Sequence, residues 1–133
     1  MKIKNLQLKF IDMLVMKFKG AVLQNQESLT NIKNNILNQH CSCVIVISAL
    51  KGIMPRLRQL YALSLRQGRG FEEEFKELQN IHEQLACELL TGKKLEEYKV
   101  EMKAQLDELY SILHHVAVLK DSSQYMKDYI LAK

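Results

Sequence analysis

Two short apolar stretches, each running into a glycine-containing turn, constrain the fold more than any other feature of the sequence. The first stretch spans residues 14–22, and its apolar part is followed by Lys17 and Gly20. The second stretch spans residues 44–52 and contains Ser48. A segment of helical pattern separates them. This order predicts two parallel strands joined by a helical crossover, so both turns should open at the same edge of a sheet.

The remaining segments have the three- and four-residue apolar spacing of helices. We expect helices over residues 28–39, 55–67, 71–92 and 93–119, with Gly92 ending the third of these. A short final helix should be capped by Asp121 or Ser122. The unbroken apolar character of residues 43–48 predicts a strand buried on both faces, as in parallel sheets.

These elements predict a helix-rich α/β fold with two parallel strands and about five helices. A sheet of two strands is marginal by itself, so the fold is expected to be incomplete. Residues 1–12 are expected to be an amino-terminal extension, because Met13 or Met16 would be a more natural start for a chain that opens with its first strand. Residues 13–133 would then be the amino-terminal portion of a larger domain.

Charge is divided unevenly along the chain. Residues 1–70 contain eleven Lys and Arg against two acidic residues, whereas residues 71–133 contain eight against thirteen. Two oppositely charged halves that pack together would explain this, and so would a basic half that binds phosphate. The basic residues are scattered without aromatic interleaving, which argues against nucleic acid as a partner. No apolar run reaches the roughly 18 residues of a membrane span, and no signal peptide is recognisable, so a cytoplasmic protein is expected.

Cysteine and histidine residues give little indication of a metal site. His40, Cys41 and Cys43 offer three donors within four residues, but zinc sites usually need a second, separated pair. We therefore expect no metal centre, and reduced thiols rather than disulfides. His82 lies on an apolar stripe and is interpreted as a core histidine.

The first turn is the best local candidate for a binding site. A lysine beside a tight turn is placed to meet an anionic ligand through its charge and the neighbouring backbone N–H groups. Lys17 and Gly20 are the residues concerned. One lysine and one glycine are far less specific than a complete phosphate-binding loop, so Lys17 merely ending a strand is the alternative.

Three segments in order resemble the aspartokinase family. Residues 17–23 read K-F-K-G-A-V-L, which is similar to the family opening K-F-G-G-T-S-V. Residues 44–54 read V-I-V-I-S-A-L-K-G-I-M, which is similar to V-V-V-S-A-x-x-G-x-T. Residues 121–132 resemble the beginning of L-S-x-x-x-x-D-x-I-L-S-x-G-E. The resemblance extends from about residue 13 to the last residue.

The resemblance implies an incomplete three-layer amino-acid-kinase fold. It also implies phosphorylation of the β-carboxyl of L-aspartate by ATP with Mg²⁺, in lysine, threonine and methionine biosynthesis. Lys17 would be the catalytic residue that neutralises phosphate charge, Lys17 and Gly20 would bind the nucleotide phosphates, and Ser48 would bind aspartate.

The sequence also departs from the family pattern. Lys19 replaces a glycine, Ala21 and Val22 replace two hydroxyl residues, and Met54 replaces a threonine. The chain ends before the glutamate of the third motif. We therefore expect the chain by itself to be inactive. The alternative is a non-catalytic helical interaction module, and in either case an exposed sheet edge predicts self-association.

Overall fold

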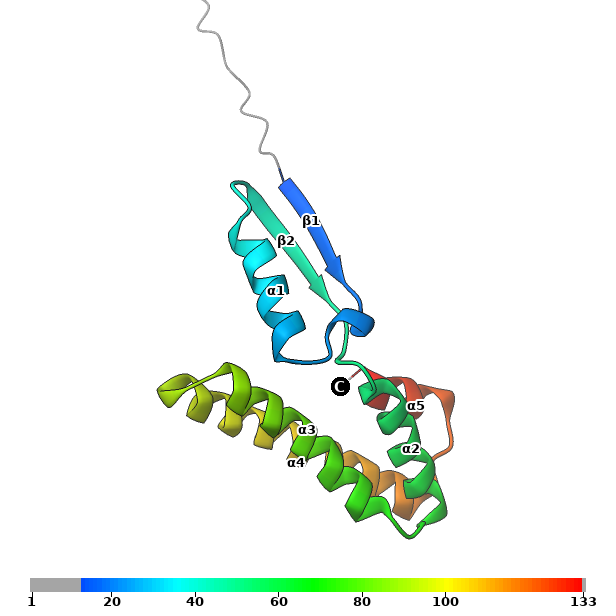
Figure 1. The fold of residues 1–133 in the computed structure, drawn as a ribbon. Helices are drawn as coiled ribbons and strands as arrows, with labels where there is room; N and C mark the ends of the chain where they lie inside the picture. Colours follow the sequence, from blue (N-terminus) through cyan, green and yellow to red (C-terminus); the bar gives the residue numbers. More distant parts are fainter. Residues whose placement is uncertain (1–12, 133) are drawn as a thin grey trace, which may run out of the picture.

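The structure, a computed structural model, describes residues 13–132, so the expected extension at residues 1–12 lies outside the described residues. Two strands and five α-helices follow one another along the chain, with a short 3₁₀ helix after the first strand (Figure 1). The elements are β1 (Met13–Phe18), η1 (Gly20–Val22), α1 (Gln26–Leu37), β2 (Ser42–Ile47), α2 (Ile53–Arg66), α3 (Phe71–Leu89), α4 (Gly92–Leu119) and α5 (Gln124–Leu131). The helix-rich α/β class expected from the sequence is confirmed.

β1 and β2 are parallel neighbours in a two-stranded sheet, with Met13 opposite Ser42 and Phe18 opposite Ile47. The crossover helix α1 runs beside the sheet (Figure 1). α1 begins two residues earlier than the apolar spacing indicates, because Asn25 caps it. The Asn25 side chain accepts a hydrogen bond from the Ser28 backbone N–H at 2.9 Å, and the Ser28 hydroxyl accepts one from the Asn25 N–H at 3.2 Å.

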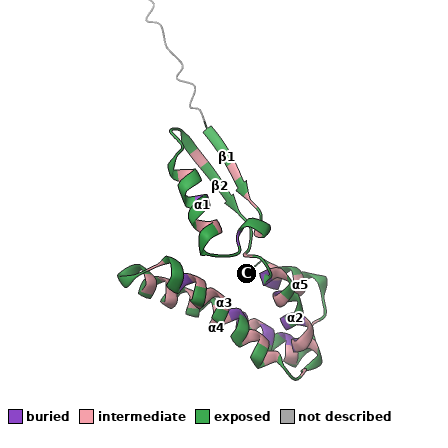
Figure 2. Cartoon of the chain, viewed as in Figure 1, coloured by how far each residue is buried: buried purple, intermediate pink, exposed green. Residues whose placement is uncertain are grey.

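The hydrophobic core lies in the helical half of the molecule. α2 packs against α3, α4 and α5, and α3 and α4 run side by side as the expected antiparallel hairpin (Figure 1). Figure 2 shows the buried positions mainly on the helices and the sheet largely exposed. The core residues share the three- and four-residue apolar spacing: Ile53, Leu57, Leu60, Tyr61, Leu78, Leu109, Leu113, Val116 and Ile130.

The expectation that the second strand is buried on both faces is wrong for the described chain. All of β2 except Cys43 is exposed. Alternate residues of β2 point to opposite faces, and both sets are exposed: Val44 (43%) and Val46 (44%) on one face, Ile45 (38%) and Ile47 (61%) on the other. The elements within residues 13–132 therefore leave both faces of β2 partly open.

Two helix boundaries also differ from the sequence expectation. α3 ends at Leu89, because the backbone of Leu90 is extended, and Gly92 begins α4 rather than ending α3. α5 is capped by Ser123, whose hydroxyl accepts a hydrogen bond from the Met126 backbone N–H at 3.2 Å. Asp121 instead stabilises the preceding turn by accepting a hydrogen bond from the Ser123 N–H at 2.9 Å.

Asp121 should make the stability of the chain sensitive to acid. Hydrogen bonds from the Ser123 hydroxyl and backbone N–H lower the pKa of Asp121 below its ordinary value of 3.8. A carboxyl with a lowered pKa stabilises the fold above its unfolded-state pKa, and this contribution is lost as pH falls through the folded-state pKa. We expect Asp121→Ala to lower the free energy of unfolding at pH 6, with the difference from the parent chain shrinking below pH 3.8. Urea unfolding of both chains at several pH values measures this difference in unfolding free energy. A difference that does not change with pH would contradict the lowered pKa of Asp121.

Candidate functional site

The carboxyl ends of β1 and β2 bring Lys17 and Ser48 to one edge of the sheet. Lys17 is opposite Val46, and the pairing continues past the end of β2, because the Ser48 backbone N–H donates to the Phe18 carbonyl at 3.0 Å. Val46 therefore shares a face of the sheet with Lys17, and Ser48 follows directly after the end of β2. Lys17 and Ser48 are both exposed. Ligands of parallel α/β sheets typically bind at this edge.

Gly20 allows the turn after β1 to pack directly against the turn after β2. A Cβ atom at this position would lie 2.7 Å from the Ala49 carbonyl oxygen, closer than van der Waals contact permits. The Lys51 backbone N–H donates to the Leu23 carbonyl at 2.9 Å, which fixes the same pair of turns. Leu23 is buried beneath them. Gly20 therefore has a packing role that requires no ligand.

We expect Gly20→Ala to lower the free energy of unfolding by about 1–3 kcal/mol, because the new methyl group must displace a backbone carbonyl rather than a flexible side chain. Ala21→Ser, at the exposed neighbouring position, is the control and should change the free energy of unfolding by less than about 0.5 kcal/mol. Chemical denaturation of both variants measures the difference. Equal stability of the two variants would show that the turns do not pack in this way.

The structure separates the family departures into exposed and packed positions. Lys19 has an extended backbone and is exposed, as are Ala21 and Val22. Met54 is half-buried in the first turn of α2 and packs against the core. Position 54 thus contributes apolar packing where the family pattern has a hydroxyl group.

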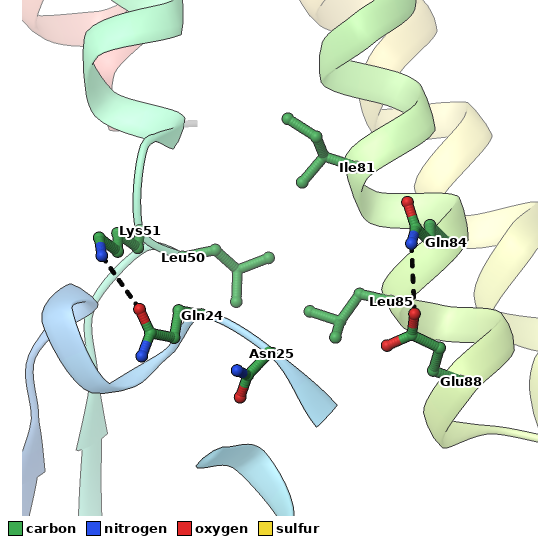
Figure 3. A pocket seen from close by; sticks show the side chains of 8 residues that line it. All are labelled: Gln24, Asn25, Leu50, Lys51, Ile81, Gln84, Leu85 and Glu88. Carbon is green, nitrogen blue, oxygen red and sulfur yellow. Dashed lines mark hydrogen bonds between the residues drawn. The ribbon is translucent and has the colours of Figure 1, made fainter. Parts of the chain in front are cut away.

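A small pocket of about 190 Å³, lined by both polar and apolar side chains, lies between the two turns and α3. Lys51 Nζ donates to Gln24 Oε1 at 3.0 Å on the side of the turns, and Gln84 Nε2 donates to Glu88 Oε1 at 3.3 Å along α3. Figure 3 shows Leu50 of the second turn facing α3 between these two polar pairs. The sequence interpretation did not single out Lys51 as a site residue. The signal was present, because Lys51-Gly52 repeats the Lys-Gly pair of the first turn.

A larger hollow of about 420 Å³ adjoins Ser48 and is mostly apolar. It is lined by side chains from α1, the end of β2, α3 and α4: Leu29, Ile47, Ser48, Ala49, Leu50, His82, Leu85, Ala86, Leu89, Leu90 and Tyr98. No lysine, arginine or carboxylate is among them. The half-buried His82 belongs to this wall, and its Nδ1 donates to the Leu78 carbonyl at 2.9 Å. It lies at the margin of the core rather than among the buried core residues.

Within residues 13–132 no cluster of three or more histidine, cysteine or acidic side chains is arranged to hold a metal ion. Cys43 Sγ instead donates to the Cys41 carbonyl at 3.4 Å, and burial together with the neighbouring Cys41 raises the pKa of the Cys43 thiol. No helix in the described part of the chain is long and apolar enough to cross a membrane.

Comparison with known proteins gives a match at the level of the fold. No protein-family profile matches the chain, and no curated protein sequence matches it significantly. Among solved structures, the chain is similar to Escherichia coli aspartokinase III in complex with lysine and aspartate, with a TM-score of 0.72 and 20% sequence identity. The match covers 90% of this chain but 25% of the aspartokinase chain. The fold is therefore aspartokinase-like, and the chain spans about a quarter of that protein's length.

Proposed function

We propose that residues 13–133 form the first portion of an aspartokinase-like kinase domain, which in completed form phosphorylates the β-carboxyl of L-aspartate with ATP in the cytoplasm. The observation that carries the proposal is the position of Lys17 near the end of β1 and of Ser48 directly after β2, at the carboxyl ends of two adjacent parallel strands in an aspartokinase-like fold. Fold alone does not define activity, so the proposal depends on these two side chains.

Phosphoryl transfer requires positioning and neutralisation of charge more than covalent chemistry. The Lys17 ammonium group would neutralise charge on the transferring phosphoryl group, and the Ser48 hydroxyl would donate a hydrogen bond to the aspartate carboxylate. Gly20 would keep side-chain atoms away from the phosphates. Mg²⁺ prefers carboxylate and phosphate oxygens, and these three residues offer no carboxylate. The ion would therefore depend on ATP and on groups outside this edge.

The test uses two proteins. The first is the chain alone, which we expect to show no aspartate-dependent ADP production. The second, hereafter the joined chain, is a fusion protein. The part of E. coli aspartokinase III that lies outside the structural match is attached after Lys133 of this chain. The joined chain should produce ADP when both ATP and aspartate are present, and the added part alone should not. A well-folded joined chain without activity would mean that the resemblance is limited to architecture.

The family departures predict that this recovered activity can be increased. Lys19→Gly removes bulk and charge beside the proposed phosphate position, and Met54→Thr restores a hydroxyl group. We expect the double variant of the joined chain to exceed the unmodified joined chain by about tenfold or more in kcat/KM for aspartate, equivalent to one or more hydrogen bonds to a charged substrate. Steady-state kinetics with varied aspartate measures the change. An unchanged or lower value would show that these positions do not limit the site.

A non-catalytic interaction module is the second candidate, and the exposed apolar side chains of the sheet favour it. On this reading the helical layer serves as the interaction surface, the exposed sheet edge pairs with another chain, and neither ATP nor aspartate is bound. Both candidates predict self-association of the chain alone, so the kinase assay on the joined chain distinguishes them. A well-folded but inactive joined chain would favour the module.

A further inference from the structure

The apolar hollow of about 420 Å³ beside Ser48 is built from four separate elements, α1, the end of β2, α3 and α4. Gln26 Nε2 donates to the Glu88 carbonyl at 2.8 Å, which ties the start of α1 to α3. Pockets of this size with mostly apolar walls are typical of sites for small molecules. The hollow is therefore large enough, and formed by enough of the fold, to hold a ligand.

Several side chains in the wall of the hollow leave apolar surface in contact with water. Ile47 is 61% exposed and Leu89 is 38% exposed, although Ala86 beside them is buried. A molecule in the hollow would cover this apolar surface and gain free energy by removing it from water.

The charge of the wall limits the chemistry of such a molecule. The residues that line the hollow include no lysine, arginine, aspartate or glutamate. A charged ligand would lose its hydration here without gaining an ionic partner, so the ligand should be neutral. Aspartate and ATP do not meet this condition. The hollow is thus a different site from the sheet edge, although Ser48 borders both.

His82 supplies the polar group that would orient a ligand. Its Nδ1 lies 2.9 Å from the Leu78 carbonyl oxygen, which can only accept a hydrogen bond, so the proton of the neutral ring is on Nδ1. Nε2 is then an acceptor. Within residues 13–132 the hydrogen bond of the His82 ring is made through Nδ1, which leaves Nε2 for the O–H or N–H of a ligand.

We propose that the apolar hollow binds a small neutral ring compound that donates a hydrogen bond to His82. An apolar cavity of about 150 Å³ can hold benzene, so about 420 Å³ has room for two fused rings. The rings of His82 and Tyr98, both in the wall, can pack against a flat aromatic ligand. The inference does not depend on kinase activity.

The experiment titrates the complete chain with three compounds that share one fused-ring skeleton and differ in a single group. At neutral pH, 2-naphthol is uncharged and has a donor, naphthalene has no donor, and 2-naphthoate is an anion. Quenching or enhancement of their fluorescence measures the dissociation constants. We expect 2-naphthol to bind about three- to tenfold more tightly than naphthalene, as one hydrogen bond provides. It should bind at least about tenfold more tightly than 2-naphthoate, whose charge finds no partner.

His82→Phe tests the assigned hydrogen bond, because phenylalanine keeps a flat ring and removes Nε2. This variant should bind 2-naphthol and naphthalene equally. His114→Phe is the matched control, since His114 is exposed on α4 and does not line the hollow, and it should keep the preference for 2-naphthol. Each preference is a ratio measured on one variant, so a modest loss of stability does not change its meaning.

Ala86→Leu tests the position of the site by filling the floor of the hollow. We expect it to weaken both neutral compounds by about tenfold or more while circular dichroism shows that the helices are retained. If Ala86→Leu does not fold, the comparison of His82→Phe with His114→Phe still decides the inference.

Four results would overturn the inference. They are the absence of saturable 2-naphthol binding, equal affinity for all three compounds, a preference for 2-naphthol that survives in His82→Phe, and undiminished binding by a folded Ala86→Leu variant. A 2-naphthol affinity that falls as the chain concentration rises would also overturn it, because a second copy of the chain would then fill the hollow. All measurements use the chain without ATP or aspartate, so failure of the proposed kinase function would leave this site unaffected.

Discussion

Replacing Leu113 by alanine is expected to lower the free energy of unfolding by about 3 kcal/mol. Leu113 is fully buried in α4, within the core shared by α2, α3, α4 and α5. Its backbone carbonyl also accepts a hydrogen bond from the buried Ser64 hydroxyl at 2.6 Å, which holds α2 against α4. A smaller side chain would leave a cavity where two helices are tied together, so the site cannot collapse easily.

Leu119→Ala is the matched control for this prediction. Leu119 lies at the end of the same helix but is 73% exposed, so its loss should cost less than about 0.5 kcal/mol. Urea unfolding followed by circular dichroism compares the two variants. Similar losses at both positions would mean that the helical half is not packed around Leu113.

Replacing Lys17 by methionine in the joined chain is expected to lower kcat by about 10²–10³-fold, the loss typical of one preorganised group that stabilises transition-state charge. Methionine keeps most of the side-chain length while it removes the ammonium group. The Michaelis constant for aspartate should change much less, because Lys17 is assigned to the phosphoryl group and Ser48 to aspartate.

Lys33→Met controls for the loss of one positive charge, since Lys33 is exposed on α1 away from the strand ends. The joined chain with Lys33→Met should have the same kcat as the joined chain without substitutions. If Lys17→Met also retained it, Lys17 would merely end β1, as the alternative interpretation of the sequence holds. If it raised the Michaelis constant for aspartate and spared kcat, the roles of Lys17 and Ser48 would need to be exchanged.

The order and type of the elements could be predicted because local patterns determine them. Periodic leucines such as Leu57, Leu60, Leu109 and Leu113 mark helix faces that the structure buries. The β-branched run of β2 and its return to a parallel neighbour also follow from sequence alone.

Boundaries were harder to predict, since single capping contacts decide them. Asn25 begins α1 earlier than the apolar spacing suggests, and Ser123 rather than Asp121 caps α5. Gly92 is common at helix ends, but its left-handed backbone instead belongs to the start of α4. Several residues in each case offered similar side chains, and only the three-dimensional contacts distinguish them.

The candidate site was predictable in part. The strand order was enough to place Lys17 and Ser48 at one edge. The contact of Gly20 with Ala49 and the pairing of Lys51 with Gln24 depend on how two turns meet, which no local pattern encodes. The exposure of β2 likewise shows that an apolar strand pattern alone does not determine burial.

The most direct test of the proposed function is detection of the reaction product. An acyl phosphate formed on the aspartate β-carboxyl reacts with hydroxylamine to give a hydroxamate, which mass spectrometry identifies. With ATP, Mg²⁺, aspartate and hydroxylamine, the joined chain should form aspartate β-hydroxamate, whereas its Lys17→Met variant and the added part alone should form almost none. ATP hydrolysis without hydroxamate, or equal hydroxamate formation by the Lys17→Met variant, would contradict the proposed role of this sheet edge.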